Sequence, residues 1–560
     1  MKLKTVSSLE KIFIDTNIDD YPETKKISVL RGERASFQVA FAANDDVGGS
    51  EMCTVTLSGD LAPIARVRKV KNVPVEYPVY KDRTDDNYLR KTPGLYPDIL
   101  MPMTYVGKDA PYGKVRAVST GLRALWIDLT VPDDCAAGEH TVAVALTNAD
   151  GETQSADFTF DVISATLPKQ ELIYTEWFHT DCLANYYRVP VWSDEHFRII
   201  GNFARTAHEN GINMLLVPVF TPPLDTEVGG ERTTTQLVKV KKVGDGYTFG
   251  FDILDRFLDL IKSCGIEYYE ISHLYTQWGV YHAPKIVADV GGEEKKIFGW
   301  DTDSHSPEYV AFLRAFLSSF LSHMKSRGED KKCYFHISDE PNEDHLESYK
   351  AGKEAIADLL DGYPVMDALS NFEFYKNGLV KNPVPASDHI GPFLEANIPD
   401  LWTYYCCGQC VGVSNRLVAM PSWRNRAIGM QMYKYGIKGF LQWGYNFYNN
   451  RFSHDETEPY ADLSGEFWVP AGDTFSVYPA KDGTALESLR LVVFYEGITD
   501  MRAMKLCESL CGKEATVGAI EHALGKEITF DDCPHIAAEM FLVRETVNEM
   551  IRNEIMNKIH

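Results

Sequence analysis

From residue 167 onward, the sequence alternates short apolar runs with longer segments whose apolar residues recur every three to four positions. This alternation predicts β-strands joined by α-helices, and therefore a parallel sheet. We expect strands near 171–179, 214–220, 267–273, 333–338, 364–369, 390–394, 401–405 and 439–443. Eight such strands favour a (β/α)8 TIM-like barrel, a fold whose active sites lie at the carboxyl ends of the strands.

The first 166 residues have a different pattern. Short β-branched or alternating runs are separated by turn clusters, such as the one at 148–151, and this predicts an all-β region. Strands at this spacing, without helices between them, indicate a β-sandwich. We therefore predict three parts: a β-sandwich accessory domain at 1–166, a catalytic (β/α)8 barrel at 167–500, and a helical C-terminal extension packed on the barrel at 501–560.

Composition limits the classes of partner. The formal net charge of −24 argues against nucleic acid and anionic membrane surfaces. No apolar run reaches the roughly 18 residues of a membrane-spanning helix, and the N-terminus lacks the apolar stretch of a signal peptide. The 11 cysteines have no framework spacing, which indicates reduced thiols and a cytoplasmic protein, unless a native signal peptide has been removed. The oligomeric state stays open, and a homodimer is one option.

Two adjacent carboxylates, Asp339 and Glu340, follow the apolar run that begins at Cys333. Pro341 ends the strand because it has no N–H to donate, and Asn342 can cap the next helix. Burial and mutual repulsion raise the pKa of at least one carboxyl in such a pair, which is what glycoside hydrolysis requires. We interpret the pair as catalytic, and the alternative is a helix cap. Successive strand residues point to opposite faces, so both can serve one site only if the chain curls at the strand end.

Polar and aromatic residues gather at the other predicted strand ends. Aromatic rings there can stack on the apolar face of a sugar while polar atoms bind its hydroxyls. For each aromatic residue the alternative is packing in the core or at the rim, and for each histidine it is a structural role. We predict substrate contacts from Trp177, His179, His273, Trp402, Tyr404, Trp443 and Asn446.

Other chemistries have no support in the sequence. The segment from Cys406 to Cys410 contains a Cys-x-x-Cys, but no second Cys or His pair completes a zinc site, so we predict no metal. Phosphate-binding, dinucleotide-binding and serine-hydrolase motifs are absent from the sequence, so we expect no cofactor.

The segments His336-Ile-Ser-Asp339-Glu340-Pro341, Gly439-Phe-Leu-Gln-Trp443-Gly-Tyr-Asn446 and Arg490…Glu496-Gly-Ile-Thr-Asp500 resemble glycoside hydrolase family 123. The resemblance implies a retaining exo-β-N-acetylgalactosaminidase that acts on glycans or glycoconjugates with a terminal β-linked N-acetylhexosamine. It also implies substrate-assisted catalysis, in which the 2-acetamido oxygen attacks C1. Asp339 would then orient the acetamido group and Glu340 would be the general acid, while Tyr404 is a candidate contact for the acetamido carbonyl.

Two alternatives stay open at this stage. The chain could be a glycosidase of other specificity, such as a β-N-acetylglucosaminidase or an enzyme for a non-acetamido sugar, because the sequence does not separate galacto from gluco. It could also be a catalytically silent carbohydrate-binding protein. The presence of both Asp339 and Glu340 argues against the second alternative, because simple sugar binding gains little from an adjacent carboxylate pair.

Overall fold

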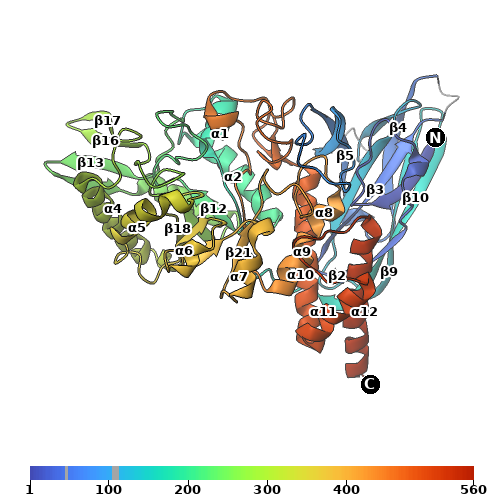
Figure 1. Ribbon diagram of the computed structural model, residues 1–560. Coiled ribbons are helices and arrows are strands. Elements are labelled where there is room, and N and C mark those ends of the chain that lie inside the picture. The colour runs from blue at the N-terminus through green and yellow to red at the C-terminus, as the bar shows by residue number, and fades with distance from the viewer. Residues whose placement is uncertain (45–47, 104–111, 560) are drawn as a thin grey trace.

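The structure is a computed structural model that describes residues 1–44, 48–103 and 112–559 (Figure 1). Its first part confirms the predicted β-rich region, in which the described residues form two five-stranded sheets and the short 3-10 turns Ile18–Asp20 and Ala62–Ile64. One sheet has the order β1 (Lys2–Ser7), β3 (Arg34–Ala42), β8 (Arg123–Thr130), β5 (Arg66–Val75) and β6 (Gly94–Pro102). The other has the order β2 (Lys26–Arg31), β10 (Thr153–Thr166), β9 (Gly138–Thr147), β4 (Ser50–Ser58) and β7 (Lys114–Val118).

The two sheets share an apolar core. Phe37 of β3 stacks on Phe158 of β10 with ring centroids 4.1 Å apart. Val55, Leu125 and Val144 are fully buried in the same cluster. Alternation along each strand places these side chains on the inner face, which is the usual basis of a two-sheet packing.

The second part is built on parallel strands. Six of them form a sheet in the order β18 (Cys333–Phe335), β15 (Tyr268–Ile271), β12 (Met214–Val217), β11 (Ile173–Glu176), β22 (Gly439–Gln442) and β21 (Trp402–Tyr404). Two more, β19 (Met366–Ala368) and β20 (Asn382–Val384), pair in parallel with each other. Single parallel bridges join Phe335 to Val365 and Ala386 to Tyr404, and so connect this pair to both edges of the six-stranded sheet.

Helices alternate with these strands, as the sequence predicts. Ser193 caps α2 by accepting a hydrogen bond from the His196 N–H, and Ser306 caps α4 in the same way with Pro307 in the first turn. The helices between β11 and β22 are α1 (Thr180–Tyr187), α2 (Asp194–Glu209), α3 (Asp252–Ser263), α4 (Pro307–Ser326), α5 (Leu346–Glu354), α6 (Glu373–Lys376), α7 (Gly391–Glu395), α8 (Ser422–Arg426) and α9 (Ile428–Tyr435).

Two smaller sheets are inserted in this part. One, formed from connections between the parallel strands, has the order β14 (Gly246–Gly250), β13 (Lys239–Val243), β16 (Ile286–Val290) and β17 (Glu293–Phe298). The other is the antiparallel pair β23 (Val477–Pro479) and β24 (Ala485–Glu487). The four-stranded sheet projects at the end of the molecule far from the sandwich (Figure 1).

The predicted strand at 390–394 is wrong. This segment is the helix α7, and the strand that pairs with β19 lies earlier, at Asn382–Val384. Pro392 lies in the first turn of α7, where its missing N–H costs nothing, so the apolar run that suggested a strand is the buried side of a helix. The strand itself contains Pro383 and only three residues, which makes it too short to recognise by alternation.

Three helices, α10 (Leu489–Cys511), α11 (Lys513–Leu524) and α12 (Ala537–Ile559), end the chain and lie beside the sandwich (Figure 1). The predicted boundary between 500 and 501 falls inside α10, whose first half is almost entirely buried. Within the described ranges, we find no helix with both the length and the apolar character needed to cross a membrane.

Candidate active site

A cavity of about 150 Å³ lies beyond the carboxyl ends of the parallel strands. Most of its wall comes from residues that end a strand or follow it directly, as expected for sites on parallel α/β sheets. It is lined by Trp177, Asp225, Trp278, Asp339, Glu340, Ala368, Tyr404, Cys406, Cys407, Leu441, Trp443 and Trp468.

Asp339 and Glu340 both line this cavity, because the chain curls between them. Glu340 has a φ of 42°, in the left-handed region that side chains other than glycine, asparagine and aspartate rarely occupy. The turn is held by the N–H of Glu340, which donates to the Ala368 carbonyl over 3.1 Å, and by the Asp339 carbonyl, which accepts from the Trp278 N–H over 3.0 Å. Strained backbone of this kind is often found where a side chain must be aimed at a site.

The electrostatics of the pair favour bound protons. Burial is the main cause that raises the pKa of Asp339 well above its usual range, and the charges of Glu340 and Asp225 raise it further. Burial of its carboxyl group also raises the pKa of Glu340, although the residue as a whole reaches solvent at the cavity mouth. The hydroxyl of Tyr404 donates to Oε1 of Glu340 over 2.9 Å and partly opposes this rise. Two interacting carboxyls of this kind titrate as a pair.

Three of the predicted aromatic contacts, Trp177, Tyr404 and Trp443, line the cavity. Trp402 does not: it begins β21, two residues before Tyr404, and its ring covers Gly439 and packs near Tyr334 at the opposite end of the strand. Because residues two apart share a face of a strand, Trp402 and Tyr404 point the same way but lie at different depths.

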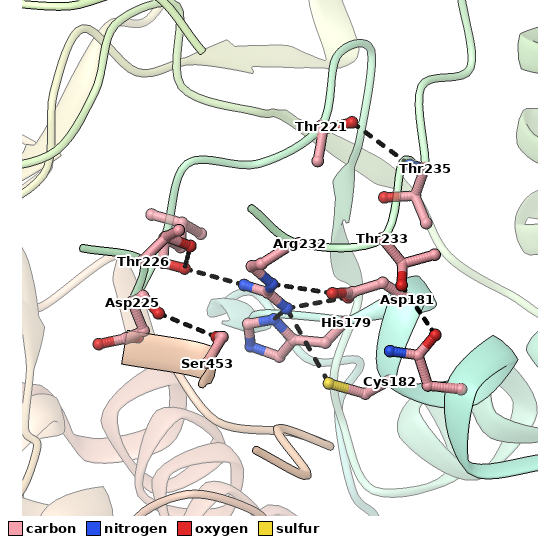
Figure 2. A network of polar contacts seen from close by, with 12 residues as sticks. His179, Asp181, Cys182, Thr221, Asp225, Thr226, Arg232, Thr233, Thr235 and Ser453 are labelled. Atoms are coloured by element: carbon pink, nitrogen blue, oxygen red, sulfur yellow. Dashed lines mark hydrogen bonds and ion pairs between the residues drawn. The ribbon is translucent and has the colours of Figure 1, made fainter. Parts of the chain in front are cut away.

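His179 and Asn446 do not line the cavity, and they bind each other and His179 binds Arg232 (Figure 2). Asn446 accepts from the N–H of His179 over 2.9 Å and donates to its carbonyl over 3.0 Å. Nη2 of Arg232 lies 3.2 Å from Nδ1 of His179, so that nitrogen accepts, and Nε2 donates to the Trp443 carbonyl over 2.9 Å. Burial, followed by the Arg232 charge, lowers the pKa of His179 to about 3, which keeps the ring neutral in this arrangement.

His273 lies below the cavity rather than in its wall. It is buried, and its ring stacks on His336 with centroids 4.2 Å apart. His336 donates to Glu270 over 2.7 Å and to Asp367 over 3.2 Å, and these two carboxylates raise its pKa to about 10 despite burial. Burial raises the pKa of Asp367, but the donors around it, Tyr349 among them, favour its carboxylate form, so we assign His336 as an imidazolium.

The same group has the residue types of a metal site. Among the described residues, His273, His336 and Asp367 are the one set of His, Cys, Asp or Glu whose ligand atoms lie close enough to share an ion. An imidazolium has no free lone pair for a metal. Both ring nitrogens of His336 carry a proton, which each donates to a carboxylate. His336 and Asp367 therefore fit a charged hydrogen-bond network better than a metal centre, while the ring nitrogens of His273 are buried without a hydrogen-bond partner among the described residues.

The cysteine cluster also reaches the cavity. Cys406 and Cys407 line it, whereas Cys410 is buried and its thiol lies 3.5 Å from the Gly408 carbonyl. Interaction with Cys407 and burial raise the pKa of Cys406 well above its usual range, so its thiol stays protonated.

The predicted substrate contacts do not include Asp225, Trp278 or Trp468, which also line the cavity. Asp225 lies in the connection between β12 and β13. Burial and the charges of Glu340 and Asp473 raise its pKa to about 7, against the opposing effect of Arg232. The strand-end rule that identified Asp339 could have found Asp225 had it been applied to the whole connection after the second strand.

Comparisons with known proteins identify the family. The family described as "Glycoside hydrolase 123, catalytic domain" matches residues 177–507. A solved family 123 glycoside hydrolase from Clostridium perfringens, described in a study of glycolipid glycan hydrolysis, superposes with a TM-score of 0.73 at 15% identity, covering 99% of this chain and 97% of that chain. A GH5 xyloglucanase from Bacteroides ovatus reaches only a TM-score of 0.29 at 8% identity, covering 89% and 100%.

No curated protein sequence matches this chain. The family match covers the cavity residues from Trp177 to Trp468 and includes both members of the carboxylate pair. This chain belongs to glycoside hydrolase family 123.

Proposed function

We propose that this chain is a retaining exo-β-N-acetylgalactosaminidase that uses the 2-acetamido group of its substrate as the nucleophile. The observation that carries the proposal is that Asp339 and Glu340, adjacent in sequence, face one cavity because Glu340 adopts a left-handed backbone. Membership of a glycosidase family supports bond cleavage over simple sugar binding.

The adjacency of the two carboxyls favours substrate assistance. Enzymes with a protein nucleophile place an acid and a carboxylate nucleophile on either side of the scissile bond, with the groups about 5 Å apart in retaining enzymes. Neighbours on one turn of chain approach the sugar from one side. A nucleophile supplied by the substrate removes the need for a carboxylate on the opposite side.

In the first step, the acetamido oxygen attacks C1, and the bond to the leaving oxygen breaks as that oxygen takes a proton from Glu340. Asp339 accepts a hydrogen bond from the acetamido N–H and stabilises the cyclic oxazolinium ion that forms. In the second step, Glu340 removes a proton from water, whose oxygen attacks C1 and reopens the ring with net retention. General acid–base help of this kind contributes about 10²–10⁴-fold in rate.

A bound substrate favours this division of roles. Asp339 has no hydrogen-bond partner on its carboxyl oxygens within the described residues, so the oxygens are available to an acetamido N–H. A bound N–H and a developing positive charge both favour the carboxylate form of Asp339. With Asp339 held as a carboxylate, the raised pKa of Glu340 keeps a proton on Glu340, where the first step needs it.

Aromatic rings support a sugar ring as the ligand. Trp443 and Trp468 line the cavity with ring centroids 5.5 Å apart, and Trp177 forms another part of the wall. Indole faces pack against the C–H face of a pyranose. The glycolipid glycans named for the Clostridium perfringens enzyme make a terminal sugar of a glycan or glycoconjugate the reasonable substrate class here.

We further propose that β19 and β20 complete the six-stranded sheet to an eight-stranded (β/α)8 barrel. The two single parallel bridges at its edges support this closure. On this view, residues 1–166 are an accessory sandwich, the catalytic domain begins at 167, and its last helix, α10, continues into the C-terminal helical extension.

The acid role is tested with Glu340→Gln on substrates with poor and reactive leaving groups. Turnover of a methyl or phenyl glycoside should fall by about 10²–10⁴-fold, and turnover of a dinitrophenyl glycoside far less, because its leaving group needs no proton. The matched control is Asp344→Asn, an exposed carboxyl in the next turn that should keep wild-type rates. Equal losses on both substrates would remove the acid role from Glu340.

A further inference from the structure

Asp225 is a third carboxyl in the cavity that the proposed mechanism does not use. It lies in the connection between β12 and β13, and it lines the same wall as Asp339 and Glu340. Its φ is 44°, which places a second acidic residue of this cavity in the left-handed region. Aspartate tolerates this region better than most residues, and the contacts that hold Asp225 show how the loop is fixed here.

The backbone of Asp225 is held on both sides. Its N–H donates to Oε1 of Gln277 over 2.8 Å, and its carbonyl accepts from the Ser453 hydroxyl over 2.9 Å. Figure 2 shows the second of these bonds, with the Asp225 side chain directed away from Arg232. The loop is therefore fixed by residues that follow two other strands, β15 and β22.

A buried arginine fixes the residue before it. Arg232 donates through Nη1 to the Leu224 carbonyl over 2.9 Å and through Nε and Nη2 to Asp181 over 2.8 and 2.9 Å (Figure 2). A paired arginine of this kind is rigid, because its planar group makes several hydrogen bonds at once. Its Nε, Nη1 and Nη2 are all committed in this way, so it holds the loop without forming an ion pair with the Asp225 carboxyl.

The carboxyl group of Asp225 has no hydrogen-bond or ion-pair partner among the described residues. No side chain or backbone group of the described residues donates to its oxygens. By contrast, the indole N–H groups of Trp177 and Trp443 already donate to Glu270 and Asp473 over 2.8 and 2.9 Å.

The other strong hydrogen-bonding groups of the wall have partners or roles. The hydroxyl of Tyr404 donates to Glu340, and Asp339 and Glu340 act in the proposed reaction. Thiols are weak partners, and the indoles of Trp278 and Trp468 can only donate. A hexosamine brings several hydroxyls into this space, and among the lining side chains in the described part of the chain Asp225 is the strong acceptor that has neither a partner nor a role in the proposed reaction.

We propose that Asp225 binds hydroxyls of the sugar ring and thereby sets the preference between the galacto and gluco epimers. A carboxyl can accept from two neighbouring hydroxyls at once, and the orientation of one hydroxyl then decides whether the second bond forms. A site built to bind a hydroxyl discriminates strongly, because the wrong epimer leaves its polar group without a partner. This inference rests on the proposed function, since it deepens the same site.

The test compares Asp225→Asn and Asp225→Gly with wild type. Both residues tolerate a left-handed backbone, so the loop geometry is kept while the charge or the whole side chain is removed. Measured quantities are kcat and KM for nitrophenyl 2-acetamido-β-galactoside and its gluco epimer, together with dissociation constants of the two free N-acetylhexosamines by calorimetry. Glu227→Gln, an exposed carboxyl two residues along the same loop, is the matched control.

For Asp225→Gly we expect KM for the preferred epimer to rise about 10- to 100-fold, with a smaller rise for Asp225→Asn, in keeping with the loss of hydrogen bonds to a charged group. The ratio of kcat/KM for the preferred epimer to kcat/KM for the other epimer should fall as this KM rises. Ser453→Ala removes a hydrogen bond to the Asp225 backbone but keeps the Asp225 carboxyl. This variant should therefore weaken the binding of both epimers to the same extent. An unchanged epimer ratio in both Asp225 variants would overturn the inference.

The calorimetric arm separates this inference from the proposed function. If wild type hydrolyses neither substrate but binds a free sugar that Asp225→Gly binds more weakly, the proposed function fails and the inference stands. If wild type hydrolyses the acetamido substrate and both variants match it, the inference alone fails. Wild type that neither hydrolyses these substrates nor binds these sugars would overturn both.

Discussion

Two groups of acids in this molecule, one at the junction of the sandwich with the C-terminal helices and one in the cavity, differ in their partners. Where the sandwich meets the C-terminal helices, Asp98, Glu496 and Asp500 each face an arginine. Arg490 of α10 lies 2.9 Å from Asp98 of β6, and Arg426 lies 2.6 Å from Asp500 and 3.0 Å from Glu496. These residues include the late motif by which the sequence resembles family 123, so that motif serves the contact between the parts of the chain and lies outside the cavity.

The acids of the cavity have no such partners. Asp225, Asp339 and Glu340 form no salt bridge to lysine or arginine among the described residues, and the pKa of each is raised mainly by burial. Unpaired acids with raised pKa values are costly in a purely structural role, and they mark functional sites more often than paired ones. The presence of an arginine partner therefore separates the acids at the junction from the acids of the cavity, to which we assign the proposed chemistry.

The largest expected effect comes from breaking a pair at the junction. Arg426→Met leaves the carboxylates of Glu496 and Asp500 buried without the positive charge of Arg426. We therefore expect the free energy of unfolding to fall by about 3–5 kcal/mol. Denaturant unfolding measures this loss. The folded fraction should keep the wild-type kcat, since Arg426 does not line the cavity.

The matched control for that variant is Arg188→Met, which breaks an exposed pair with Glu456 and should leave the unfolding midpoint unchanged. A loss of activity in Arg426→Met without a loss of stability would contradict the assignment of the junction acids to structure.

Removing an acid from the cavity should have the opposite profile. For Asp339→Asn we expect kcat to fall by about 10²–10³-fold, because a group that stabilises charge in the transition state is lost. The free energy of unfolding should stay the same or rise, because the substitution removes a partly buried carboxyl that has no cationic partner. Steady-state kinetics and thermal unfolding on one preparation check both, and a destabilised but active variant would reverse the comparison.

Tyr404→Phe should move the pH profile. The hydroxyl of Tyr404 donates to Glu340 and lowers its pKa, so without it the pKa of Glu340 rises further. The acid then keeps its proton to a higher pH. The alkaline limb of the kcat/KM profile should therefore shift upward, and a shift downward or no shift would show that another group controls this limb.

A pH-dependent effect on stability is expected at His336, a buried cation between two acids. Its pKa is raised from 6.5 to about 10 in the folded protein, so its contribution to stability is complete below pH 6.5 and is lost as the pH rises toward 10. His336→Asn should be less stable than wild type at pH 6, with the gap narrowing by pH 10. Unfolding at these two pH values measures it, and a gap that widens with pH would contradict the charged assignment.

The sequence was sufficient for the features that depend on local pattern. Periodicity located most strands and helices, and an apolar strand that stops at Asp339 and Glu340 marked the carboxylate pair. It could not show how both side chains reach one cavity, because the left-handed turn at Glu340 depends on a bond to Ala368 in another strand.

Features that depend on tertiary contacts could not be predicted from the sequence. Trp402 is a residue type that often contacts sugars, but it lies at the start of the three-residue strand β21. Its ring therefore packs over Gly439 and not at the cavity. His179 and Asn446 read as ligand contacts, yet their hydrogen bonds are made to each other and to Arg232 and Trp443. The strand-end rule could have marked Asp225 as a candidate, but its place in the cavity depends on a loop held by Gln277 and Ser453, far away in sequence.

The most direct test of the central claim is hydrolysis by wild type of 4-nitrophenyl 2-acetamido-2-deoxy-β-D-galactoside beside the plain 4-nitrophenyl β-D-galactoside. These substrates differ only in the group that substrate assistance requires as nucleophile. We predict cleavage of the acetamido substrate with no detectable cleavage of the plain galactoside. Comparable cleavage of both would contradict substrate-assisted catalysis by Asp339 and Glu340.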